Sequence, residues 1–184
     1  MKKLLLLSAF ITLSYLVQAQ STEYHAFKVD IGLGYAIPSS GSGNGVKAGA
    51  VFAIEPHYRL TNELAIGLRI EGAVLGYQPN PADNSSYSFS ALSSYAFTGE
   101  YYLMNGGFRP FIGAGVGLFK EQYGVGNNQT GNYFVANGAT NVGFFPRVGF
   151  EAGHFRLSAT YNIVGNSNSY AAFTIGAFFG GGKK

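Results

Sequence analysis

The stretch FKVDIGLGYAI, residues 27–37, decides the fold because its residues alternate between two kinds. The odd positions hold Phe27, Val29, Ile31, Leu33, Tyr35 and Ile37, and the even positions hold Lys28, Asp30, Gly32, Gly34 and Ala36. Successive side chains of a β-strand point to opposite faces. The stretch therefore predicts a strand with one large apolar face and one face of charged and small residues.

The same alternation recurs in seven further stretches, which we predict to be strands: 48–60, 63–77, 87–104, 108–123, 140–152, 155–164 and 170–179. Fourteen ionisable residues of these stretches share the polar face, and Lys120 alone breaks the pattern. The fourteen are Lys28, Asp30, Glu55, His57, Arg59, Glu63, Arg69, Glu71, Glu100, Arg109, Glu121, Arg147, Glu151 and Arg156. The sequence thus predicts an all-β chain of eight strands whose charges lie on one side.

Composition excludes several classes of protein. The 184 residues suffice for one domain. Charged residues make up 11% of the chain, less than half of the roughly 25% found in soluble domains. With 16% aromatic residues and no Cys, the chain is neither disordered nor built on disulfides or a thiolate metal site. Four of the twelve basic residues lie at the chain ends (2, 3, 183 and 184), so no basic patch indicates nucleic-acid binding.

The N-terminus has the pattern of an export signal. Two lysines precede an apolar stretch, residues 4–17, and Val17-Gln18-Ala19 offers a cleavage site before Gln20. A membrane anchor is the alternative, but the apolar run is shorter than the ~20 residues that a spanning helix needs. We expect a cleaved signal peptide at 1–19 and one barrel domain at 20–184.

The polar face indicates a closed lumen rather than a solvated surface. A soluble sandwich is the alternative, and it would carry many exposed Lys and Glu residues. Here Gly, Ala and Ser mix with balanced charges and with Phe111, Phe119 and Phe145, as in a narrow packed lumen. Tight turns at 61–62, 105–107 and 153–154 alternate with connections at 38–47, 78–86, 124–139 and 165–169. These features predict an eight-stranded antiparallel up-and-down transmembrane β-barrel with its termini on the periplasmic side.

Three segments carry a resemblance to a known family: GFRPFIGAGVG at 107–117, PRVGFE at 146–151, and the closing Phe178-Phe179. With them the mature chain resembles the small eight-stranded outer-membrane β-barrel family of Gram-negative bacteria. The resemblance implies the bacterial outer membrane as location, its lipid as surroundings, and the barrel-assembly machinery as a partner during insertion. Family members often end in an aromatic residue, whereas residues 180–184 follow Phe179 here.

The predicted topology places eight charged residues in the periplasmic half of the lumen: Lys28, Asp30, Arg59, Glu63, Glu100, Arg109, Glu151 and Arg156. Four are acids and four are bases. Because a buried charge is costly unless it is paired, we predict that they form an interlocked ionic plug. A lumen of eight strands has room for side chains or one small ligand, so a pore for bulk flow is not expected.

The outer half of the lumen differs in composition from the charged half, since it combines small residues with Leu75, Leu92, Gly117, Phe119 and Phe145. Two interpretations are open. These residues either form a shallow cup for a small apolar ligand, or the small residues only make room for their larger neighbours.

Motifs for chemistry are weak. Glu55 and His57 share the lumen face and could be a base with its orienting group, but a hydrogen-bonded pair within the plug is favoured. No metal-ligand spacing and no cofactor motif is found. We therefore expect a non-enzymatic structural or surface-recognition scaffold acting through loops 38–47, 78–86 and 124–139. The alternative is a carrier or narrow channel for small apolar molecules, and a lipid-modifying enzyme is a distant third.

Overall fold

The computed structural model describes residues 23–39, 46–77, 86–127, 133–165 and 169–183. They form eight strands: β1 (Phe27–Pro38), β2 (Val46–Arg59), β3 (Leu64–Tyr77), β4 (Ser86–Tyr102), β5 (Phe108–Asn127), β6 (Tyr133–Ala152), β7 (Phe155–Val164) and β8 (Tyr170–Gly180). None of the described residues belongs to a helix long and apolar enough to cross a membrane. The predicted signal peptide, 1–19, lies outside the described residues.

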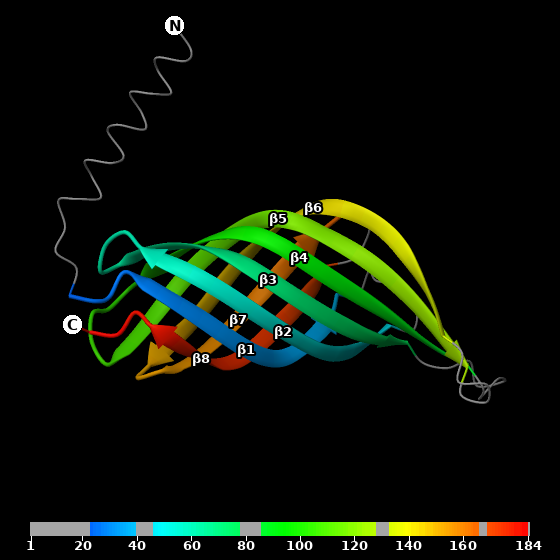
Figure 1. Ribbon diagram of the computed structural model, residues 1–184, viewed down its shortest axis with the longest axis horizontal. Coiled ribbons are helices and arrows are strands. Elements are labelled where there is room, and N and C mark those ends of the chain that lie inside the picture. Colours follow the sequence, from blue (N-terminus) through cyan, green and yellow to red (C-terminus); the bar gives the residue numbers. More distant parts are fainter. Residues whose placement is uncertain (1–22, 40–45, 78–85, 128–132, 166–168, 184) are drawn as a thin grey trace, which may run out of the picture.

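Each strand pairs with its sequence neighbours, and β1 pairs with β8, so the sheet closes into a barrel. All eight pairings are antiparallel, and the strands wind around one axis (Figure 1). The predicted all-β, eight-stranded, up-and-down barrel is confirmed. Closure satisfies the backbone hydrogen bonds of every strand, which an open sheet in lipid would leave unmade at its edges.

Alternation sorts the side chains as the sequence predicts. Outward residues are exposed: Phe97 is 73% and Leu33 is 62% accessible. Inward residues are buried: Arg69 is 0% and Glu100 is 1% accessible. Thirteen of the fourteen ionisable residues of the predicted polar face are buried in the lumen, the exception being Glu63. Apolar outside and charged inside is the arrangement of a transmembrane barrel.

The strands differ in length more than predicted. β5 and β6 have 20 residues each and β7 has 10, or about 68 Å against about 34 Å at 3.4 Å per residue. The predicted loop at 124–139 is too long, because the β5–β6 ladder continues to Gly126↔Tyr133 past a bulge near Lys120. Residues 128–132 of this predicted loop lie outside the described residues. Its Gly and Asn content suggested a loop, but backbone pairing holds both segments in strands. The ends of the other two predicted loops also belong to strands, namely Pro38, Val46, Lys47 and Ser86. Residues 40–45 and 78–85 of these loops lie outside the described residues.

The two ends of the chain meet at one end of the barrel, which we call the terminal end; the other is the loop end. Tyr24 forms a β-bridge with Lys183, and the His25 amide donates to the Gly182 carbonyl at 2.9 Å. The turns after β2, β4 and β6 lie at the terminal end as well. Gly153 has φ of 61° in the last of these turns, a conformation that glycine adopts without steric cost.

Candidate functional site

Ion pairs centred on Arg147 and Glu100 fill the middle of the lumen. Arg147 on β6 donates to both carboxylate oxygens of Glu55 at 2.5 and 2.8 Å, and to Glu100 at 3.0 Å. Arg156 on β7 donates to Glu100 as well. All four side chains are less than a tenth exposed. Bidentate pairing of this kind fixes both position and orientation of the partners.

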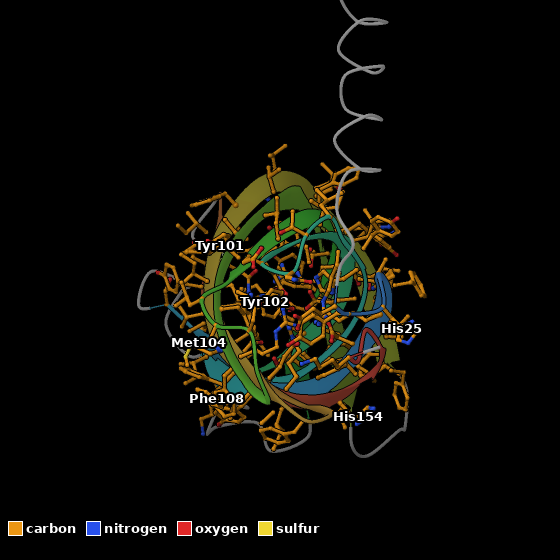
Figure 2. All side chains as sticks on the ribbon, turned by 90° about the vertical axis from the view of Figure 1, so that its left-hand side faces the viewer. His25, Tyr101, Tyr102, Met104, Phe108 and His154 are labelled. Carbon is orange, nitrogen blue, oxygen red and sulfur yellow. The ribbon has the colours of Figure 1, made fainter. Side chains whose placement is uncertain are left out.

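Nearer the terminal end, Glu151 collects several donors. Lys28 donates to it, Arg156 donates at 2.7 Å and Arg59 at 3.3 Å. The Tyr102 hydroxyl lies 2.8 Å from Glu151 and 3.0 Å from Glu100, and it accepts from Lys28 at 2.8 Å. Figure 2, which views the terminal end, shows Tyr102 near the middle of the barrel and Tyr101 at its rim. Tyr102 therefore connects β1, β4 and β6 across the lumen.

We call these groups the lumen cluster: Lys28, Asp30, Glu55, His57, Arg59, Glu100, Arg147, Glu151 and Arg156. Four acids face four bases, with His57 in addition. A cavity of only about 10 Å³ remains beside Asp30, Glu55 and Arg156, about the smallest volume that holds one water. The cluster is thus charge-balanced and closely packed.

His57 is the one histidine of the lumen cluster. Its Nδ1 lies 2.7 Å from Asp30, and its Nε2 lies 3.2 Å from the Thr98 hydroxyl. Ligand atoms of Glu55, His57 and Glu100 lie within 4.8 Å of one another, close enough to hold a metal ion. Arg147 already occupies both carboxylates, however, and its fixed charge opposes a second cation there. The arrangement fits a hydrogen-bonded group better than a metal centre or a catalytic base.

A second polar group lies nearer the loop end. Arg69 donates to Asn162 at 2.7 Å and lies 3.4 Å from Glu71. Glu71 also accepts from the Tyr170 hydroxyl at 2.5 Å. The Arg69 guanidinium lies 3.6 Å from the ring centre of Phe145. This second polar group lies between the lumen cluster and the apolar residues of the lumen nearer the loop end.

Six of the eight residues predicted for the plug lie in the lumen cluster: Lys28, Asp30, Arg59, Glu100, Glu151 and Arg156. The other two do not. Glu63 lies in the turn before β3, where Asn105 donates at 2.7 Å and Thr61 at 3.1 Å. The Asn105 hydrogen bond is the main reason that the pKa of Glu63 is lowered. Arg109 is buried at the terminal end, where it forms no ion pair with any described residue.

The residues predicted to line an outer cup do not enclose an open volume. Leu75, Leu92, Phe119 and Phe145 are 0–4% exposed and belong to one packed cluster. A Cβ at Gly117 would overlap Ala96 of the neighbouring strand, so this glycine lets the strands approach. The side chains of Leu75, Leu92, Phe119 and Phe145 therefore pack together in the outer half of the lumen.

Three further members of the cluster are not among the eight residues predicted for the plug. Glu55 and His57 were expected as a pair within the plug, whereas Arg147 was predicted only to lie on the lumen face. Strand register gives the height of such residues in the barrel, since Glu55 pairs with Asp30 between β1 and β2. Tyr102 was not assigned to either face, although its parity is that of Glu100.

No protein-family description matches the sequence, and no curated protein is significantly similar to it. Solved structures are similar in fold. Neisserial surface protein A is 17% identical with a TM-score of 0.53, covering 86% of this chain and 97% of that one. The attachment invasion locus protein Ail of Yersinia pestis is 9% identical with a TM-score of 0.50, covering 86% and 100%. The chain therefore has the fold of the small eight-stranded outer-membrane β-barrels.

Proposed function

We propose that the protein is a non-enzymatic barrel of the bacterial outer membrane whose lumen is plugged and whose loop end recognises a surface partner. In this orientation the terminal end faces the periplasm, reached after cleavage of residues 1–19, and lipid covers the outward face. The barrel-assembly machinery would insert it. The packed lumen cluster supports a scaffold rather than a pore, and the filled outer lumen removes the reason to prefer a carrier of apolar molecules.

The observation that carries the recognition role is the extension of β5 and β6. The apolar band of such barrels is about 25 Å tall, and 10-residue β7, about 34 Å long, rises about 26 Å along the barrel axis at a tilt of about 40° and suffices to cross it. β5 and β6 are twice as long, and in Figure 1 they reach well past β7 and β8. A ribbon projecting from the membrane on the loop side is positioned to contact other molecules.

The extension also carries contact residues. Phe134 is 70%, Val135 is 45% and Tyr123 is 43% exposed. Exposed aromatic and aliphatic side chains on a polar ribbon are typical of binding surfaces. Neighbour names point the same way: one is a surface protein and the other an attachment invasion locus protein.

A shortened ribbon tests this role. Residues 125–134 are replaced by Asn-Gly, which joins the paired residues Gly124 and Val135 by a two-residue turn. Gram-negative cells that display either version are applied to arrays of immobilised glycans and matrix proteins. We expect the full-length ribbon to bind at least one array element and the shortened one to lose that binding, with equal amounts of folded barrel in the membrane.

The double substitution Leu68→Ser and Ile70→Ser, on outward positions of β3, is unsuitable as a control because it disturbs the lipid face. A better control is Gln122→Ser, which changes a polar ribbon residue and keeps the ribbon length. Binding that persists in the shortened form, or no binding by the full-length form, would contradict the recognition role.

A further inference from the structure

The mouth at the terminal end is a cavity of about 330 Å³ with a positive lining. We call it the terminal mouth. Its lining includes Arg59, Arg109, His154 and Lys183, but only one carboxylate, that of Glu151. Tyr24 and Phe178 contribute aromatic surface, and five glycines form much of the rim. A volume of this size lies at the lower end of the range for small-ligand sites.

Arg109 is the unusual residue of the terminal mouth. It is 4% exposed, and its guanidinium lies between two aromatic rings, 4.2 Å from Tyr24 and 4.1 Å from Tyr102. One of its nitrogens donates to the Asn62 carbonyl at 2.5 Å. Its Nε and Nη1 atoms are buried without a hydrogen-bond partner. Among the described residues, no carboxylate forms an ion pair with it.

The nearby carboxylates are already engaged. Glu151 pairs with Arg109 in the β5–β6 ladder, but its oxygens receive Lys28, Arg156 and Arg59. Glu63 is held by Asn105 and Thr61 instead. Lys183 pairs with Glu23 at 3.4 Å and Arg59 with Glu151 at 3.3 Å, so among the described residues Arg109 is the cation of the terminal mouth that lacks an ion pair.

The lumen as a whole is balanced, since six buried acids face six buried Lys and Arg residues among the described residues. This balance does not extend to the surroundings of Arg109, because none of these six acids forms an ion pair with it.

We propose that the terminal mouth binds a small oxyanion, with Arg109 as its principal ligand and Arg59 beside it. A buried cation without a counter-charge is costly, and an oxyanion supplies that charge. The guanidinium group suits such a ligand because its N–H donors match phosphate and carboxylate oxygens. Arg59 also has a buried Nε without a partner, so both arginines have donors to offer.

Which oxyanions can reach the terminal mouth depends on the orientation of the barrel, and their identity therefore rests on the orientation given in the proposed function. With the terminal end toward the periplasm, the terminal mouth meets both the headgroups of the inner leaflet and soluble anions. The chemistry is shared by a lipid phosphate and by a free phosphate, so the experiment must separate the two.

The test uses the full chain purified in a zwitterionic detergent without phosphate groups, titrated calorimetrically with inorganic phosphate. Sodium chloride at matched ionic strength is the reference. We expect Arg109→Gln to weaken phosphate binding by about tenfold or more, because a charge-assisted hydrogen bond and the site's charge are lost. Lys120→Gln is the matched control: it removes one positive charge from an exposed position far along β5 and should leave the affinity within about twofold.

Equal phosphate affinity in the wild type and in Arg109→Gln would overturn the proposal, as would a wild type that responds to phosphate no more than to chloride. If Arg109→Gln fails to fold, arginine Nε–Hε resonances of the wild type give the answer. Phosphate should shift a resonance that is absent from Arg109→Lys, and no shift at any arginine would overturn the site.

Nanodiscs then identify the source. Loss of phosphate binding when the barrel enters phosphatidylglycerol nanodiscs assigns the site to a lipid headgroup, and retained binding assigns it to a soluble periplasmic anion. The readout involves none of the ribbon residues. Failure of surface recognition and failure of anion binding are therefore separate results.

Discussion

At the scale of single residues, the Tyr102 hydroxyl connects several charged side chains. It contacts Lys28, Glu100 and Glu151 inside the lumen, whereas Tyr101 points outward and is 49% exposed. The ring of Tyr102 also faces Phe111 at a centroid distance of 5.6 Å. The two adjacent tyrosines thus form a matched pair for a mutational test.

We expect Tyr102→Phe to lower the free energy of unfolding by about 1–3 kcal/mol, because buried charged partners lose a hydrogen bond while the ring remains. Tyr101→Phe should change it by less than about 0.5 kcal/mol. The difference is measured by urea unfolding of both variants in detergent micelles, monitored by far-UV circular dichroism. Equal effects of the two substitutions would contradict the bridging role of Tyr102.

Residue positions were predictable where alternation alone decides them. The lumen side of Lys28, Arg69 and Glu121 follows from parity, because a strand offers only two faces. Which charged residues form ion pairs with one another was not predictable from the sequence. Lys28 and Glu151 are 123 residues apart, and their meeting depends on how far the strands are staggered when the barrel closes. Glu63 was misplaced because β3 begins one residue later, which leaves it in a turn.

At the scale of elements, the seam between β1 and β8 closes the barrel and depends on close approach of the two strands. A Cβ at Gly176 would overlap the Ile31 carbonyl of β1. Gly72 on β3 offers the opposite case, since a Cβ there would meet no atom within 4 Å. Gly176 lies on the lumen side and Gly72 on the outward side, so the two glycines differ in the face they occupy as well as in the space around them.

Gly176→Val should therefore prevent or slow closure, while Gly72→Val should fold as the wild type does. Folded barrels resist detergent without heating, so the fraction of compact, heat-shiftable protein on a denaturing gel measures closure. A Gly176→Val protein that folds to the same extent as Gly72→Val would show that the seam tolerates a wider spacing.

Element bounds were predictable where a tight turn ends a strand, as at Gly153-His154, because glycine and polar residues favour turns there. They were not predictable at the loop end. The ladder of β5 and β6 continues through Gly124 and Asn137, residues that are poor strand formers alone. Pairing with a neighbour overrides this weak preference, and one chain read in isolation does not reveal the neighbour.

At the scale of the whole molecule, the lumen cluster bears on transport. Four acids and four bases in contact leave a cavity of about 10 Å³, too small for a hydrated ion. The purified barrel in a planar bilayer should show no large, steady conductance at neutral pH. Arg147→Ala, which removes a side chain joined to Glu55 and Glu100, provides the comparison. A wild type that conducts steadily would disprove the plug.

Two of the ion pairs that fill the axis join residues far apart in the chain: 92 positions separate Arg147 from Glu55, and 123 separate Lys28 from Glu151. Neither of these two pairs can form from a single hairpin. A half-built barrel would present bare charges where lipid tails would touch them, and such exposure is strongly unfavourable. Entry into the bilayer and joining of the first strand to the last must consequently proceed together, as one event.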